Sequence, residues 1–429
     1  MPVGYKPVDY DKLEKALGVN YHPLLSSRWA VKRYGAVVNE IGVLNGNPAI
    51  IRDGSTYMLY HMRMASTTDD FKIVLRTSAD GIVWSSPLVV MTKDMVNSAG
   101  YNVNGVFQPT VIKEQGKYYL FFAGDQLMYW GARSNAIFLA TSNDGVNFSD
   151  IRMVIKPEKD SMLHSVWHPW VVKFKETYYM YCLATDYRVP TTRPGNIRLV
   201  VFTSKNLTDW RWEGFIAMEG AYGDWDGGRM IDHALVNIED KLLVIVYAAE
   251  SVPDALDMKI GIAYSFDGVT FIGRRQLLVR ASVEEARFIA DASILYEGGK
   301  LKIWYEADDG VTVSTTGLST LSIMYAEAVP SESQVMELLL NRDITTNGIT
   351  TDPIDARYGS KTFWLKSNQS GTMYIQAYDE ATRSFADIDS VSVSANVLTR
   401  YQTTLRARLM RLRFVPTATA TVSAWVVLE

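Results

Sequence analysis

The stretch Ser142-Asn143-Asp144-Gly145-Val146-Asn147-Phe148 decides the fold, because the chain repeats it. The other copies are Ser78-Ala79-Asp80-Gly81-Ile82-Val83-Trp84, Ser265-Phe266-Asp267-Gly268-Val269-Thr270-Phe271 and a degenerate Ser204-Lys205-Asn206-Leu207-Thr208-Asp209-Trp210. Their serines lie 64, 62 and 61 positions apart along the chain. Self-similarity at a fixed period indicates a repeat architecture, and Asp-Gly between β-rich segments is typical of a hairpin turn. Each copy therefore predicts one tight turn, built again in every unit.

The segments around each turn follow one plan of short strands. Three units open on a residue followed by proline, at Asn47-Pro48, Gln108-Pro109 and His168-Pro169. A fourth unit opens near Ile231 without the proline, and a fifth opens near Ala290 with only three clear strands. Five units of short antiparallel strands predict an all-β, five-bladed β-propeller over residues 40–330, which avoids open sheet edges by closing radially. We expect the N-terminal extension, residues 1–39, to supply the missing strand near Trp29 to Val38.

The period stops after Pro330, and residues 335–429 alternate polar and apolar residues in short runs. The run Thr372-Met373-Tyr374-Ile375-Gln376-Ala377 is an example. This pattern predicts a small C-terminal β-sandwich that serves as a binding or oligomerisation module. The sandwich resembles those that end phage tail or virion proteins.

Composition excludes several classes of function. A formal net charge of -4 offers no basic field for nucleic acid. The single cysteine, Cys182, lies in a strand-like segment and predicts a buried thiol. No signal peptide and no apolar segment long enough to span a bilayer is recognisable, so we expect a cytoplasmic or virion-associated protein without membrane insertion.

The X-Pro openings and the Ser-x-Asp-Gly turns together resemble the five-bladed propeller glycosidases of families 43, 62 and 32. The resemblance implies three acidic residues around a central funnel, because glycoside hydrolysis needs one carboxyl as proton donor and another as base or nucleophile. At the first-blade and third-blade positions this chain has Asn47 and His168. Carboxylates stand at the fourth-blade and fifth-blade positions, Asp232 and Asp291.

Asp232 and Asp291 are therefore our candidate catalytic pair, with one held protonated by the charge of the other. The alternative is that each carboxylate caps backbone groups at the start of its blade. His168 and His233 also open blades, where a neutral imidazole could bond sugar hydroxyls, bind a metal or water, or act as an acid. A structural hydrogen bond to a neighbouring strand is the competing interpretation of both.

The remaining substrate-binding candidates are polar or aromatic residues predicted at the funnel. Asp186 and Arg188 precede a long connection, and Trp130, Trp167 and Trp225 could stack on sugar rings. Arg229 lies in a glycine-rich loop, where it could clamp a carboxylate of an acidic sugar. The full substrate-binding set is Asn47, Gln108, Trp130, Trp167, His168, Asp186, Arg188, Trp225, Arg229 and His233.

These observations predict a glycoside hydrolase acting on a poly- or oligosaccharide. The alternative is a non-catalytic glycan-binding protein, including a phage tail or virion component that recognises a receptor. We expect no cofactor and no catalytic metal, with a structural calcium ion or a water molecule at the propeller axis as the alternative. The expected partner is a carbohydrate, with self-association through the C-terminal module.

Overall fold

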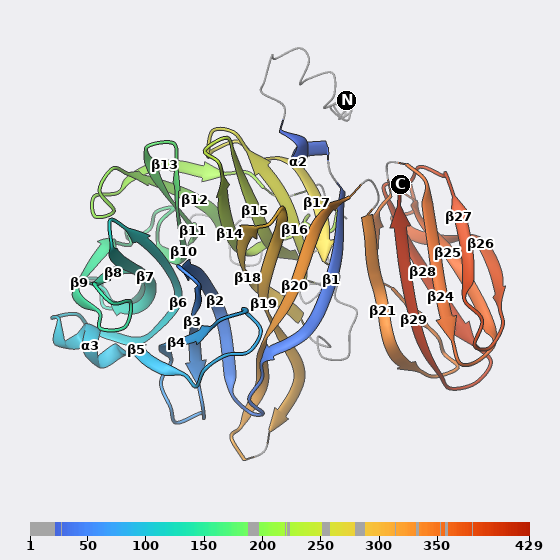
Figure 1. The fold of residues 1–429 in the computed structure, drawn as a ribbon, viewed down its shortest axis with the longest axis horizontal. Coiled ribbons are helices and arrows are strands. Elements are labelled where there is room, and N and C mark those ends of the chain that lie inside the picture. Colours follow the sequence, from blue (N-terminus) through green and yellow to red (C-terminus); the bar gives the residue numbers. More distant parts are fainter. Residues whose placement is uncertain are drawn as a thin grey trace, which may run out of the picture.

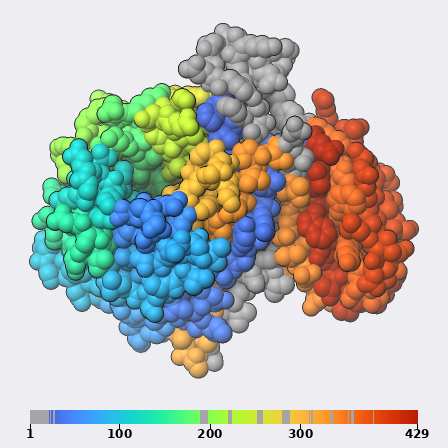
Figure 2. Space-filling view, viewed as in Figure 1, coloured from blue at the N-terminus to red at the C-terminus, as the bar shows by residue number. Residues whose placement is uncertain are grey.

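The structure, a computed structural model, describes residues 22–26, 28–187, 197–218, 220, 224–250, 258–278, 288–313, 315–331, 334–351, 353–356, 359–379 and 381–429. Arg188, one of the candidate binding residues, lies outside them. The described residues form two β-rich bodies side by side, a ring of blades and a smaller sandwich (Figure 1). The space-filling view shows the same division, with the C-terminal residues gathered on one side (Figure 2). No helix among the described residues is long and apolar enough to cross a membrane.

Each of the first four blades contains four consecutive antiparallel strands, and one parallel residue pair, Leu44 with Leu321, joins blade 1 to blade 5 in a single sheet. Blade 1 contains β2 (Leu44–Asp53), β3 (Thr56–Met64), β4 (Lys72–Ser78) and β5 (Leu88–Met91). Blade 2 contains β6 (Val103–Glu114), β7 (Lys117–Leu127), β8 (Arg133–Ser142) and β9 (Ser149–Ile155). Blade 3 contains β10 (Ser165–Phe174), β11 (Thr177–Thr185), β12 (Ile197–Ser204) and β13 (Arg211–Ile216). Blade 4 contains β14 (Met230–Ile238), β15 (Leu242–Glu250), β16 (Met258–Ser265) and β17 (Ile272–Leu278).

Blade 5 combines strands from both ends of the propeller sequence. It contains β18 (Phe288–Glu297), β19 (Lys300–Val313) and β20 (Leu318–Ser331), and β1 (Arg28–Val38) pairs with β20 as its outermost strand. The pairing is antiparallel and runs from Arg28 opposite Ser331 to Val38 opposite Ile323 (Figure 1). The N-terminal strand therefore closes the ring, in the segment where the sequence predicts it. Two short helices, α2 (Pro23–Ser26) and α3 (Lys93–Ser98), lie outside the blades.

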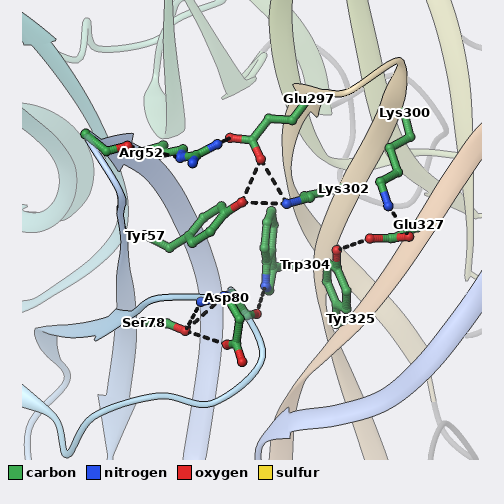
Figure 3. A network of polar contacts seen from close by, with 12 residues as sticks. Arg52, Tyr57, Ser78, Asp80, Glu297, Lys300, Lys302, Trp304, Tyr325 and Glu327 are labelled. Carbon is green, nitrogen blue, oxygen red and sulfur yellow. Dashed lines mark hydrogen bonds and ion pairs between the residues drawn. The ribbon is translucent and has the colours of Figure 1, made fainter.

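Figure 3 shows the polar contacts at the seam between blades 5 and 1. Glu297 accepts a hydrogen bond of 2.7 Å from the Tyr57 hydroxyl and forms ion pairs of 3.2 Å with Arg52 and 2.9 Å with Lys302. The Trp304 indole, completely buried, donates a 2.9 Å hydrogen bond to the backbone carbonyl of Gly81. Both blades thus contribute charged and aromatic side chains to the closure.

The repeated turn is built by its own side chains. In the second copy, Ser142 Oγ accepts the Gly145 N–H at 3.0 Å, and Asp144 Oδ1 accepts the N–H groups of Val146 and Asn147 at 2.8 Å. Gly145 has φ 74°, a left-handed conformation that costs a glycine little. The Ser, Asp and Gly of the phrase therefore have separate structural roles, which explains why they recur together.

Each clean turn also contacts an aromatic residue of the preceding blade. Tyr60 donates to the carbonyl of Gly145 at 2.7 Å, and Tyr181 donates to that of Gly268 at 2.8 Å, as Trp304 does to Gly81. The degenerate third turn has Leu207 in place of glycine, and its carbonyl accepts from Trp210 of the same turn at 3.2 Å. The corresponding strand residue of blade 2, Phe121, has no donor and packs edge-on against the Trp210 ring. The turns therefore lock neighbouring blades together.

The C-terminal body packs two antiparallel sheets around an apolar core that includes Phe363, Leu365 and Phe414. One sheet has the order β21 (Gln334–Ile344), β29 (Ala420–Leu428), β24 (Lys361–Ser367), β27 (Thr399–Thr403). The other contains β22 (Ile349–Thr350), β23 (Ile354–Asp355), β28 (Leu409–Pro416), β25 (Gly371–Asp379) and β26 (Ser384–Val393). Ion pairs of 3.8 Å between Arg33 and Glu337 and 3.3 Å between Arg408 and Asp224 join it to the propeller.

Candidate active site

The innermost strands of four blades begin with the same β-bulge. Two residues of each strand oppose one residue of its neighbour, at positions 47–48, 108–109, 168–169 and 291–292. The first bulge residues, Asn47, Gln108, His168 and Asp291, all have positive φ, between 44° and 56°. Left-handed backbone is uncommon for residues other than glycine and collects at functional sites. The repeated strain marks the starts of the inner strands as a functional region.

Blade 4 begins differently. Its register shift inserts one residue between Met230 and Asp232, and none of the described residues of β14 has a positive φ. Asp232 is completely buried, and its Oδ1 accepts the backbone N–H of Ala248 at 3.1 Å. Asp232 therefore lies deeper than the four bulge residues, although it was predicted at an equivalent position.

Asp291 is the centre of a hydrogen-bond network that joins several blades. It accepts hydrogen bonds from the Asn47 side-chain amide and from His168 Nε2, the latter at 2.7 Å. Glu306, on β19, accepts the backbone N–H of Asn47 at 2.9 Å. His168 is itself fixed by Gln108, whose Oε1 accepts the His168 backbone N–H at 3.0 Å. Residues of blades 1 and 3 thus meet at one carboxylate of blade 5, and blade 2 supports His168.

The three carboxyl groups of this cluster have divergent pKa values. Burial raises the pKa of Asp232 and of Glu306 well above the usual range, and the negative charge of Asp291 adds to both shifts. Burial also acts on Asp291, but the charge of His168 and hydrogen bonds from Glu306 and Asn47 outweigh it and lower the pKa of Asp291. The lowered pKa leaves Asp291 ionised at neutral pH, and the raised pKa values of Asp232 and Glu306 favour the protonated forms of these two neighbours.

Exposure separates the residues that can touch a ligand from those that support them. Asp291, Asn47 and His168 keep 8%, 8% and 6% of their surface exposed, whereas Asp232 and His233 are completely buried. Burial, with the charge of His168, lowers the pKa of His233 to about 3, so its imidazole is neutral. The predicted role of His233 in binding sugar hydroxyls is not supported, because its side chain has no exposed surface for a ligand to contact.

Three other predicted binding residues are engaged elsewhere. The Trp225 indole is 4% exposed, packs against Tyr247 and lies so close to Gly261 that a Cβ there would collide with it. The structure therefore argues against Trp225 as a platform. Arg229 pairs with Glu250 at 2.7 Å, which already neutralises the cation predicted to clamp an acidic sugar. Asp186 is buried.

An aromatic stripe lies at the end of blades 2 and 3 where the inner strands begin. Trp130 stacks on His164, with ring centroids 5.8 Å apart, and His164 contacts Tyr187 at 4.8 Å. Tyr129 continues the stripe at 4.8 Å from Trp130. Tyr129 and Tyr187 are 76% and 59% exposed, so the stripe presents rings to solvent. Trp130 thus belongs to a larger platform than predicted, and Trp167, at the start of β10, is partly buried.

Glu306 is the site residue that sequence reasoning missed. It lies in the strand Leu301-Lys302-Ile303-Trp304-Tyr305-Glu306-Ala307, where an acidic residue interrupts a buried apolar segment. Its position requires Gly46, because a Cβ at residue 46 would collide with the Glu306 carboxyl. A buried carboxylate in a central strand is costly unless it is paired or protonated, so this interruption was an available signal.

No group of three or more His, Cys, Asp or Glu side chains among the described residues is placed to share a metal ion. What the cluster offers chemically is an ionised carboxylate with a protonated neighbour, in contact with an imidazole and an amide. Such pairs, in which the environment pushes two pKa values apart, are typical of acid–base sites.

Comparison with known proteins identifies a family through the N-terminal part of the chain. Residues 40–268 match the description "Glycosyl hydrolases family 32 N-terminal domain". A sucrose-6-phosphate hydrolase of Bacillus subtilis is 26% identical over 198 residues, which cover 45% of this chain and 39% of that protein. The chain thus spans about two fifths of the length of this curated relative.

Two solved structures are similar along nearly the whole chain. A sucrose-6-phosphate hydrolase from Lactobacillus gasseri has a TM-score of 0.52 at 12% identity, covering 98% of this chain and 97% of its own. A family 32 β-fructofuranosidase of Bombyx mori has a TM-score of 0.50 at 12% identity, covering 97% and 96%. At this level of identity the likeness concerns the fold, a propeller followed by a sandwich.

Proposed function

Because the chain belongs to glycosyl hydrolase family 32 through its N-terminal domain, we propose that it hydrolyses glycosidic bonds of oligosaccharides at the Asp291 cluster. The observation that supports this best is the ionised Asp291 beside the protonated Asp232. The charge of Asp291 contributes to the raised pKa of Asp232, so the two carboxyl groups are close neighbours. They act as one unit that shares a proton.

The proposed reaction uses this pair twice. Asp291, which reaches the funnel, passes the shared proton to the glycosidic oxygen as the bond from the anomeric carbon to that oxygen breaks. Water then adds to the anomeric carbon and returns a proton to the pair. Asp232 is buried, so it acts by supplying and receiving the proton through Asp291. His168 and Asn47 fix the Asp291 carboxylate and bond sugar hydroxyls.

The substrate we propose is a fructosyl-containing oligosaccharide. The two kinds of relative reported above carry sucrose-6-phosphate hydrolase and β-fructofuranosidase as names. The stripe from Tyr129 to Tyr187 would hold the neighbouring sugar residues by stacking. We propose no metal or organic cofactor for the reaction.

The test is release of reducing sugar from sucrose, sucrose 6-phosphate, fructo-oligosaccharides and arabino-oligosaccharides. Activity should rise with pH as Asp291 ionises and fall at higher pH as Asp232 loses its proton. Asp232→Asn keeps a hydrogen-bond donor toward Asp291 but cannot transfer a proton, so it should slow the reaction and remove the high-pH limb. An unchanged pH profile in this variant would contradict the proposed proton transfer.

A specific observation favours a second candidate, glycan binding without hydrolysis. The first-blade position has Asn47 in place of the acid that the family resemblance implies, and its amide occupies one Asp291 oxygen. This candidate predicts glycan binding without sugar release for the wild-type protein. The resemblance of the C-terminal sandwich to phage tail and virion modules suggests one version of this second candidate. In that version the protein binds a receptor on behalf of a virion and self-associates through the sandwich. Mass measurement of the full chain in solution tests the self-association.

A further inference from the structure

Two tryptophans lie side by side on the outer face of the C-terminal sheet β21-β29-β24-β27. Trp364 on β24 is directly opposite Trp425 on β29. Their chain neighbours Phe363, Leu365 and Val426 are buried in the sandwich core, so the two indoles point away from it. Directly opposite residues on adjacent strands have Cβ atoms about 5 Å apart, so the two indoles lie next to each other on one face of the sheet.

The tryptophans form the floor of a groove of about 440 Å³. Lys366, Asn396 and Leu398 line it beside them. Arg400, opposite Trp364 on β27, holds its guanidinium 5.5 Å from the centre of the Trp364 ring. The groove therefore combines two indole rings with an amide and an ammonium group, and the Arg400 guanidinium lies over the Trp364 ring beside it.

We propose that this groove is a second glycan-binding site, separate from the funnel. Sugars present apolar C–H faces and a rim of hydroxyl groups, and the groove matches both with rings and donors. Its volume falls in the range of roughly 300–1,000 Å³ that is usual for small-ligand sites. A stable protein partner needs roughly 800 Å² on each side, far more than two indoles provide, so a second copy of the chain is the poorer fit.

This inference rests on the proposed function in one respect only, which is the choice of a glycan as the ligand. Two sugar sites on one chain raise the effective concentration of a long glycan at the funnel, whereas a short one cannot engage both sites. The groove should therefore affect the binding of polymers and leave the turnover of short oligosaccharides unchanged.

Binding can be measured with the full chain carrying Asp291→Asn, which prevents turnover. The probes are inulin and levan, two fructose polymers, in affinity electrophoresis and calorimetry. Adding Trp364→Ala and Trp425→Ala together should weaken polymer binding by about tenfold, the effect of losing one to two kcal/mol of stacking. Trp212→Ala is the matched control, because Trp212 is an exposed tryptophan (41%) on the propeller strand β13. In the active background, the double variant should raise the KM for polymer but not for a trisaccharide.

Equal affinity in the double variant and its parent, or no binding of either polymer by the parent, would overturn the proposal. A change of oligomeric state in the double variant, seen by light scattering, would instead make the groove an interface between copies. If the alanine variants fold poorly, Trp364→Phe with Trp425→Phe should give a smaller loss of affinity, and no loss counts against the site. Retained hydrolysis in Asp291→Asn would refute the proposed catalytic role while leaving tryptophan-dependent binding intact.

Discussion

The turns at the blade corners and the bulges at the blade starts are both repeated, yet they differ in what they keep constant. The corners keep their side chains: Ser, Asp and Gly recur because each makes a defined backbone contact. The bulges keep their backbone, with positive φ in four blades, while the side chain changes from Asn47 to Gln108, His168 and Asp291. The turns, with constant side chains, join neighbouring blades. The bulges, with a constant backbone conformation and varied side chains, form the candidate site.

The largest expected effect comes from removing the one acidic bulge residue. Asp291→Asn keeps the size of the side chain but cannot accept or donate a proton, so sugar release should fall by about 10³-fold or more. The control is Asp53→Asn, which removes a carboxylate paired with Lys113 at the far end of β2. A loss of activity in the control, or full activity in Asp291→Asn, would show that the bulges are no more catalytic than the corners.

Asn47→Asp adds the carboxylate that the family resemblance implies at the first bulge. In this chain it would face Asp291 and Glu306, so its folded-state pKa should lie above the ordinary value near 4. A raised pKa gives stability that is complete below the unfolded-state value and lost as pH rises through the folded-state value. The variant should match wild type at pH 3–4 and lose on the order of 3 kcal/mol by pH 8. Thermal unfolding across this pH range checks it, and a pH-independent difference would contradict the carboxyl cluster.

Gly145→Ala tests the corner. The glycine has φ 74°, and a Cβ would approach the Tyr60 hydroxyl to 2.9 Å, so the substitution should cost about 2 kcal/mol of stability. Activity per folded molecule should not change, because the turn is remote from Asp291. Gly116→Ala is the matched control, since it has φ 80° with nothing within 4 Å of the added Cβ. Equal losses in both variants would mean that backbone strain, and not the contact with blade 1, explains the effect.

Tyr60→Phe and Tyr181→Phe give the smallest expected effect. Each removes the hydrogen bond to a turn carbonyl and leaves that acceptor unsatisfied in a buried place, which should cost about 1–2 kcal/mol. Denaturant unfolding measures the loss. Phe121 is the natural comparison, because it takes the place of these tyrosines in blade 2 and has no hydroxyl group. The turn carbonyl near it, that of Leu207, accepts a hydrogen bond from Trp210 and is therefore not left unsatisfied.

The sequence predicts the repeated turns and the fold well, because the serine, aspartate and glycine of the repeated phrase are compatible with a single turn conformation. It also places the inner strand starts and brings Asp232 and Asp291 together. It does not reveal that the blade 4 bulge lies at a different point of its strand or that Asp232 and His233 are completely buried, since register shifts depend on pairing across strands. Glu306 is missed for a similar reason: it lies beside Asp291 only through the register of β18 and β19, in which Ala290 faces Glu306. The loop position of Trp225 suggests an exposed ring, but packing buries that ring.

The closure of blade 5 has a consequence for the way the chain is made. β1 is synthesised before every other strand of the ring, yet its partner β20 ends at Ser331. At a synthesis rate of roughly 5–20 residues per second, on the order of 15–60 seconds pass between the synthesis of β1 and that of β20. During this time it is an unpaired strand, and Arg28, Lys32 and Arg33 give it the positive charge that discourages pairing with strands of other chains. The earliest strand of the ring thus has its partner in the latest one, and a nascent chain can complete the ring only after Ser331 has been translated.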